Sequence, residues 1–176
     1  APAADVRAIC RRMGMCFQHF NLFPHMTVLD NILEAPRVVK KMKTEEIMPQ
    51  AEELLKKVGL WEKRDTYPSR LSGGQQQRVA IARALASEAP VILADEPTGN
   101  LDEDTAQDIT EILKESAHKM NKCVVVVTHS NELAKQADVV FRLKKGELQV
   151  LERVQDGAAQ PQSRRNNTPR SERRAK

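Results

Sequence analysis

Apolar residues recur every three or four positions in four stretches of the chain, a spacing that indicates amphipathic helices. The first stretch opens at Thr27 and is expected to end near Pro36. The second covers residues 44–58 and stops at Gly59, a residue typical of the position after a helix. Because Pro49 fits best in a first turn, the second helix could also begin near Pro49. The apolar faces of the two helices comprise Val28, Leu29, Ile32, Ile47, Ala51, Leu54, Leu55 and Val58.

The third and fourth stretches each begin at a residue that caps helices well. Ser72 is followed three residues later by Gln75, which is the spacing of a capping box, and Pro90 ends that stretch. Asp102 is the expected cap of the fourth helix. The buried faces are predicted to comprise Val79, Ala82, Leu85, Ala86, Ala106, Ile109, Ile112, Leu113 and Ala117.

Continuous apolar runs alternate with the later helices and have the composition of strands. Residues 91–95 (VILAD) and 123–128 (CVVVVT) are predicted to be buried strands, the first of them on both faces. A short strand is expected within residues 14–20, and the runs 139–143 and 147–151 are expected to form a hairpin. A short helix is expected between the CVVVVT strand and this hairpin. The order of strands and helices predicts an α/β fold: a mostly parallel sheet covered by helices, with an inserted helical region.

Length and cysteine content limit the kind of protein this is. A chain of 176 residues predicts one domain, and its apolar runs are all shorter than the ~18 residues that span a bilayer. The N-terminal dozen residues lack the apolar region of a signal peptide. The three cysteines, at positions 10, 16 and 123, form no CxxC pair, which favours a reducing compartment and predicts a cytoplasmic location.

The net charge of +4 comes from the C-terminal end of the chain. From Arg153 onward there are seven Lys/Arg and two Asp/Glu residues, whereas the rest of the chain has 21 Lys/Arg and 22 Asp/Glu residues. The body is therefore nearly neutral, and we expect no nucleic-acid partner for it. Residues 155–176 contain no aromatic or branched aliphatic side chain, which predicts a basic, disordered and solvated tail. Anionic lipid and nucleic acid are the minority alternatives for a partner of this tail.

Polar residues follow three of the predicted strands, at the edge where open α/β sheets bind ligands. Asp95 and Glu96 end the VILAD strand, and successive side chains of a strand point to opposite faces. Asp95 could therefore hold Mg²⁺ while Glu96 orients or deprotonates a water molecule. His129 could donate to a phosphate or to that water, and Gln18 could bring an amide oxygen to Mg²⁺. Taken singly, each residue also fits a structural role, such as a solvated turn or a packed histidine.

A second candidate site lies where the Ser72 helix begins. Gly73 and Gly74 leave bare backbone N–H groups at the positive end of the helix dipole, an arrangement that favours an anion such as phosphate. Ser72 adds a hydroxyl group. The structural alternative is an N-cap that happens to contain glycines.

The order of these motifs resembles the nucleotide-binding domain of ABC transporters. Residues 71–75 are similar to the signature motif, 91–96 to Walker B with the catalytic glutamate, and 99–102 to the D-loop. Gln18 resembles the glutamine of the Q-loop, and His129 resembles the switch histidine. The stretches ADEPTGNLD and FQHFNLFPHMTVLDNI are most similar to the macrolide-exporter and lipoprotein-release branch, and parts of them also resemble polar amino-acid importers.

The resemblance covers about residues 7–151 and implies a division of the chain. It predicts a partial ATP-binding domain over residues 1–154 and the basic tail over 155–176. Within the domain, a helical subdomain with the signature motif is expected at about 21–88. The core from Walker B to the switch histidine is expected at 89–154.

The resemblance also implies ATP and Mg²⁺ as ligands and a second nucleotide-binding domain as a partner. Two such domains pair head to tail, so the signature motif would contact ATP held by the partner domain. A transmembrane permease subunit would contact residues 18–32 and place the protein in the cytoplasm, on the inner face of the cell membrane. The implied roles are contact with the partner's ATP for Ser72, Gly73, Gly74 and Gln75, Mg²⁺ binding for Asp95 and Gln18, general base for Glu96, γ-phosphate contact for His129 and dimer communication for Asp102.

One motif of the family is missing from these 176 residues. Walker A, GxxxxGK[ST], holds the β- and γ-phosphates, yet none of the seven glycines is followed five residues later by Gly-Lys. In the family this loop lies upstream of the Q-loop. The expectation is therefore a domain cut after its first phosphate loop, one that binds ATP poorly by itself.

Two alternative functions have weaker support. DNA-repair and chromosome-organising relatives insert long coiled coils between the Q-loop and the signature motif, whereas only 54 residues separate Gln18 from Ser72 here. A non-hydrolysing partner or regulatory module would use its signature motif in trans. Glu96 and His129 argue against that module, because it has little need of both.

Overall fold

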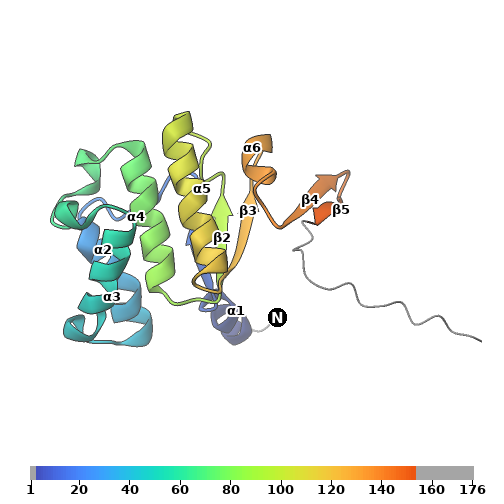
Figure 1. The fold of residues 1–176 in the computed structure, drawn as a ribbon. Coiled ribbons are helices and arrows are strands. Elements are labelled where there is room, and N and C mark those ends of the chain that lie inside the picture. The colour runs from blue at the N-terminus through green and yellow to red at the C-terminus, as the bar shows by residue number, and fades with distance from the viewer. Residues whose placement is uncertain (1–2, 154–176) are drawn as a thin grey trace, which may run out of the picture. The chain divides into compact units, whose positions relative to one another are not determined.

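The computed structural model describes residues 3–153, which fall into two compact units divided between Ala137 and Asp138. The first unit is built on a parallel sheet in the order β1 (Met13–Cys16), β2 (Val91–Asp95), β3 (Cys123–Val127) (Figure 1). The predicted α/β fold with a parallel sheet is confirmed. The carboxyl ends of all three strands lie at one edge, because the pairing is parallel and in step across the sheet.

The second unit contains a hairpin of β4 (Val139–Lys144) and β5 (Glu147–Arg153), which pair antiparallel. Its two-residue turn places Lys145 and Gly146 at φ values of 51° and 84°. Positive φ at both positions matches the right-handed twist of the flanking strands. The hairpin predicted from the two apolar runs is therefore confirmed.

Helix α4 (Gly73–Ala86) is the central helix of the first unit and packs on β1, α2, α3 and α5 (Figure 1). The prediction of one apolar stripe is too narrow, because this helix has neighbours on nearly every side. Its buried residues include the four expected ones and five more: Gly74, Gln77, Val79, Ala80, Ile81, Ala82, Ala84, Leu85 and Ala86. The capping box at Ser72 and Gln75 is present as predicted.

Helix α2 (Val28–Lys40) begins after Thr27, whose hydroxyl accepts the backbone N–H of Asp30 at 3.1 Å. The prediction that it ends near Pro36 is wrong, since the helix continues to Lys40. Pro36 cannot donate to the carbonyl one turn earlier, but it is buried and its own carbonyl accepts the Met42 N–H at 3.3 Å. Tertiary burial thus outweighs the lost hydrogen bond.

Helix α3 (Thr44–Lys57) begins at Thr44 rather than near Pro49. The carboxylate of Glu46 accepts the Lys43 N–H at 3.0 Å and so caps the first turn, which makes the earlier start favourable. Its five predicted apolar residues are all buried. Gly59 follows the helix at φ 70°, a conformation that favours glycine, as predicted.

The remaining elements of the first unit are α1 (Ala3–Cys10), two short 3₁₀ helices (Trp61–Lys63 and Pro68–Arg70), α5 (Glu103–His118) and α6 (Asn131–Ala134). Nothing in the sequence pattern predicted α1 or the 3₁₀ turns. Asp102 caps α5 as expected, accepting the Thr105 N–H at 3.0 Å. No helix within residues 3–153 is long and apolar enough to cross a membrane. The predicted disordered tail lies outside the described residues.

The apolar strands β2 and β3 are less buried than predicted. In β2 only Ile92 and Ala94 are fully buried. In β3 the side chains of Val125 and Val127 are 45% and 63% exposed. β3 pairs with β2 on one side and forms the edge of the sheet within the described residues, while α5 packs against it. The prediction of a buried strand is therefore correct in its secondary structure and wrong in its burial.

Candidate active site

The carboxyl edge of the sheet gathers the polar residues predicted to follow the strands. Asp95 is the last residue of β2 and pairs with Val127, the last residue of β3. Glu96 and His129 follow these strands by one and two residues, and Gln18 follows β1 by two. Because the strands are adjacent and parallel, all four residues come to one edge, where α/β sheets bind ligands.

The carboxylate of Glu96 is fixed from both sides by residues that follow β3. One oxygen accepts the Thr128 hydroxyl at 3.0 Å, and the other accepts the His129 backbone N–H at 2.8 Å. The Glu96 N–H donates to the Val127 carbonyl at 2.9 Å, with its own φ at 43°. The side chain is only 16% exposed. Glu96 is therefore a preorganised acceptor, held where β2 and β3 end.

The backbone of His129 binds Glu96, whereas its imidazole ring is open to solvent. Its Nε2 lies 3.8 Å from a Glu96 oxygen, yet the side chain is fully exposed. An exposed ring beside an ordered carboxylate can contact a ligand without moving the strand. Asp95 and Gln18 are half-buried, and neither side chain has a hydrogen bond or ion pair with the rest of the described chain.

Asp95 and Gln18 have the right chemistry for a magnesium ion. Carboxylate and amide oxygens are ligands that Mg²⁺ accepts, and it usually takes one or two carboxylates together with substrate phosphates and water. No group of three His, Cys, Asp or Glu side chains within residues 3–153 could hold a metal by itself. The residues present fit an ion that arrives with a phosphate ligand.

The two signature glycines have different surroundings. A methyl group added at Gly73 would lie 3.7 Å from Leu101 and Phe20, an ordinary contact. A methyl group added at Gly74 would overlap the Cγ2 methyl of Thr105 on α5. Gly74 therefore lets α4 approach α5, whereas Gly73 leaves its backbone partly open. The packing of Gly74 does not test whether its N–H contacts a phosphate, so the phosphate role of both glycines stays a prediction.

Ser72 is exposed, and its hydroxyl accepts the Gln75 N–H at 3.3 Å. The Gln75 side chain accepts in return from the Ser72 N–H and from Lys63, both at 3.2 Å. Gln75 is therefore engaged within the helix cap. The groups of this cap that remain open to an anion are the Ser72 hydroxyl and the backbone at Gly73.

Several residues that shape the site were missed by sequence reasoning. Thr128 binds Glu96, and Thr105 is held by two hydrogen bonds to Asp102, at 3.0 Å and 2.9 Å. Arg83 and Asn31 bind the loop that carries Gln18. Asn31 gave a signal as a polar residue next to the apolar face of α2, and the Thr105 contacts follow from the predicted cap at Asp102. The contacts of Thr128 and Arg83 depend on loop geometry that no spacing rule encodes.

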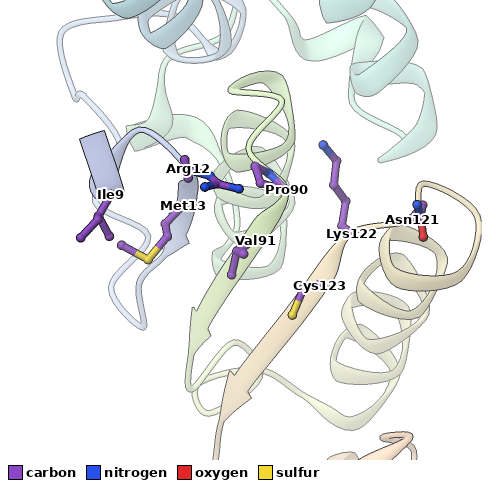
Figure 2. A pocket seen from close by; sticks show the side chains of 8 residues that line it. All are labelled: Ile9, Arg12, Met13, Pro90, Val91, Asn121, Lys122 and Cys123. Atoms are coloured by element: carbon purple, nitrogen blue, oxygen red, sulfur yellow. The ribbon is translucent and has the colours of Figure 1, made fainter. Parts of the chain in front are cut away.

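Two cavities flank the first unit, and Glu96 lines neither of them. One, of about 650 Å³, lies at the amino ends of the strands, beside Met13, Val91 and Cys123 (Figure 2). It is thus at the edge of the sheet opposite the candidate site. The other, of about 490 Å³, is a groove between β1, α2 and α4. Its walls include Phe17, Asn21, Phe23, Val38, Val39 and Arg83.

With the motifs and their geometry in place, comparison with known proteins identifies the class. The ABC transporter family model matches residues 3–99, and the chain belongs to that family. It is 46% identical to the arginine transport ATP-binding protein ArtM of Bacillus subtilis, over 89% of this chain and 63% of ArtM. It is also 46% identical to the L-cystine transport ATP-binding protein TcyN of Escherichia coli, over 88% of this chain and 60% of TcyN.

A solved structure shows the same fold. The chain superimposes on the ATP-binding cassette MJ0796, a dimer bound to ADP and Pi, with a TM-score of 0.75 and 40% identity. The match covers 89% of this chain and 69% of that one. The chain spans only about 60% of the length of the two curated relatives named above. Neither of these relatives is named for macrolide export or lipoprotein release, so that branch remains a prediction.

Proposed function

We propose that this chain forms part of the ATP-binding and ATP-hydrolysing subunit of an ABC transporter. The observation that carries the proposal is Glu96, held at the carboxyl edge by the Thr128 hydroxyl and the His129 N–H. This carboxylate is beside residues able to hold Mg²⁺ and a phosphate. The MJ0796 dimer bound to ADP and Pi supports a reaction between two such subunits.

In this proposal the chain's own residues divide the work of hydrolysis. Glu96 accepts a proton from the attacking water, and its two hydrogen bonds hold the accepting oxygens in place. The exposed His129 ring donates to the γ-phosphate. Asp95 and Gln18 would hold Mg²⁺, which neutralises charge on the phosphate oxygens.

The signature end of α4 faces the other subunit in this proposal. The Ser72 hydroxyl and the Gly73 N–H would contact the γ-phosphate of ATP held by the partner domain. Gly74 and Gln75 would support this contact indirectly: Gly74 packs against Thr105, and Gln75 caps the helix. Asp102 would communicate across the dimer, since its carboxylate fixes Thr105 against Gly74.

The groove between β1, α2 and α4 suits a helix of a transmembrane permease subunit. Phe17, Phe23, Val38 and Val39 are exposed at 39%, 40%, 63% and 49%, and they line one continuous groove. Exposed apolar side chains gathered in a groove are typical of an interaction site. Such a partner would hold the chain at the cytoplasmic face of the cell membrane.

We further propose a polar amino acid as the transported substrate. ArtM, TcyN and a GlnQ of Geobacillus stearothermophilus are named for arginine, cystine and glutamine transport, and all three are 46% identical to this chain. This choice replaces the exporter branch with the alternative that the sequence also allowed.

The test of hydrolysis is Glu96→Gln in the full-length gene product, assayed by phosphate release. Removing a general base is expected to lower turnover by about 10²–10⁴-fold, with the ATP-bound dimer retained on gel filtration. Glu62→Gln, at an exposed acid in a 3₁₀ turn, is the matched control and should leave turnover unchanged. Undiminished phosphate release from Glu96→Gln would contradict the assignment of the base.

A further inference from the structure

The loop of residues 17–27, which carries Gln18, has an uncommon backbone. Phe20 and Asn21 have φ values of 63° and 47°, in the left-handed region, which is costly for a bulky residue such as phenylalanine and better tolerated by asparagine. Around them the loop supplies only short turns, from the Phe20 N–H to Phe17 at 3.0 Å and from the Asn21 N–H to His19 at 2.6 Å. Two successive residues in this region therefore need support from another part of the fold.

The second half of the loop is held by Asn31 of α2, which is completely buried. Its Oδ1 accepts the Phe23 N–H at 2.8 Å, and its Nδ2 donates to the Phe23 carbonyl at 3.1 Å. The same Nδ2 also reaches the carbonyls of Met26 and Thr27, at 3.3 Å and 2.9 Å. These contacts leave Phe20 and Asn21 without a link to Asn31.

The first half of the loop is held by Arg83 of the signature helix α4. Its Nη1 donates to the Asn21 carbonyl at 2.6 Å, and its Nη2 donates to the Phe20 carbonyl at 3.0 Å. These are the carbonyls of the two left-handed residues. Hydrogen bonds from a charged donor are the stronger kind, so Arg83 is well suited to hold this turn.

The surroundings of Arg83 show that the loop is its main partner. Within the described residues its guanidinium forms no ion pair with a carboxylate, and the face of the Phe23 ring lies 6.0 Å away. Burial lowers the pKa of Arg83, because the charged form loses hydration. A half-buried cation without a counter-ion must be compensated by hydrogen bonds, and the two loop carbonyls supply them.

We propose that Arg83 is a positioning residue for Gln18, which ties the Gln18 loop to the signature helix. The proposal rests on the proposed function, in which Gln18 contributes to the Mg²⁺ and ATP site. The Phe20 ring also lies next to Gly73, so α4 contacts this loop at its N-terminal end as well as at Arg83. Arg83 and Asn21 both line the groove, so an occupant of the groove would contact this link directly.

The first test measures loop order by amide hydrogen exchange and needs no nucleotide. In Arg83→Met, exchange in residues 18–23 is expected to become about ten- to a hundredfold faster, the factor associated with hydrogen bonds from a charged donor. Arg83→Lys should show part of the increase, because a lysine cannot donate in the same planar geometry to both carbonyls. Exchange in β2 and α5 should not change.

Arg78→Met is the matched control, since Arg78 lies on the same helix but pairs with Asp108 of α5. It should leave exchange in the 17–27 loop unchanged. Unchanged loop exchange in Arg83→Met would overturn the proposal. An equal increase throughout β1, β2 and α5 would overturn it too, because that result indicates general destabilisation.

The second test asks whether Arg83 acts through Gln18, using ATP hydrolysis by the full-length gene product. Arg83→Met is expected to raise the Mg²⁺ concentration for half-maximal activity about tenfold, and the double variant with Gln18→Ala should match Gln18→Ala alone. Additive effects would overturn the proposal. If the wild-type protein shows no hydrolysis, the proposed function fails, and the exchange experiment still decides whether Arg83 orders the loop.

Discussion

The carboxyl edge of the sheet and the N-terminal end of α4 hold their functional groups by different means. At the sheet edge, Glu96 is fixed by two hydrogen bonds from Thr128 and His129. At the helix end, Ser72 is exposed and its hydroxyl accepts the Gln75 N–H within its own capping box, while Gly74 packs against Thr105. The difference teaches that hydrogen bonding sets the position of the Glu96 carboxylate, whereas packing between α4 and α5 sets the position of the signature residues.

The largest expected effect comes from breaking the packing at the helix end. Gly74→Ala places a methyl group against Cγ2 of Thr105, whose rotation is limited because its hydroxyl donates to Asp102. Overpacking of this kind is expected to lower the free energy of unfolding by roughly 1–3 kcal/mol. Urea denaturation of the chain, followed by circular dichroism, measures it.

Two further variants make that result specific. Gly73→Ala meets only ordinary contacts, so its free energy of unfolding should stay within about 1 kcal/mol of wild type. Thr105→Ser removes Cγ2 and keeps the hydroxyl bonded to Asp102, so it should restore most of the stability of Gly74→Ala. If Gly73→Ala destabilises the chain as much as Gly74→Ala, packing against Thr105 does not distinguish the two glycines.

A smaller effect is expected from the hydrogen bonds at the sheet edge. Thr128→Val removes the donor to Glu96 and also the acceptor of the Ser130 N–H at 3.0 Å. The loss should cost about 1 kcal/mol of folding stability and reduce phosphate release by the full-length gene product about tenfold, with the KM for ATP little changed.

Thr128→Ser is the control for that experiment, because it keeps the hydroxyl and removes only a methyl group. Its phosphate release should remain close to wild type. Equal losses in Thr128→Val and Thr128→Ser would show that Glu96 does not depend on this hydrogen bond.

In both regions the sequence predicted which residues lie at the site better than it predicted the contacts that hold them. The rule that parallel strands present their carboxyl ends at one edge correctly brought Asp95, Glu96 and His129 together, because it depends on topology alone. It could not predict Thr128 donating to Glu96, a contact between residues 32 positions apart that needs the exact course of a loop. At the helix end, the capping box was visible in the spacing, but the tight contact of Gly74 with Thr105 was not.

Burial was harder to predict than secondary structure for a related reason. The run CVVVV has the composition of a covered strand, yet composition does not say which neighbours a strand has. Val125 and Val127 are exposed on β3, an edge of the sheet within residues 3–153. Pro36 shows the reverse case, since its propensity to end a helix is overridden by its burial against the rest of the fold.

The smallest expected effect concerns Cys16, which lies where the two regions meet. It is the last residue of β1, and its sulfur accepts a hydrogen bond from Gln77 of α4 at 3.2 Å. Burial raises the pKa of the Cys16 thiol to about 12. At pH 8 only about 10⁻⁴ of this thiol is ionised, so iodoacetamide should modify Cys10 and Cys123, which are exposed, and leave Cys16 unmodified.

Mass spectrometry of the alkylated chain measures that protection, and the unfolded chain in urea, where all three thiols should react, is its control. The raised pKa of Cys16 also makes folding stability depend on pH. The thiol has a pKa of about 9 in the unfolded chain and about 12 in the folded chain. Its contribution to stability is therefore complete below pH 9 and is lost as the pH rises to about 12. Rapid modification of Cys16 at pH 8 in the folded chain would mean that the contact between β1 and α4 opens readily. The packing that positions the signature helix would then be too mobile to explain the difference between the two regions.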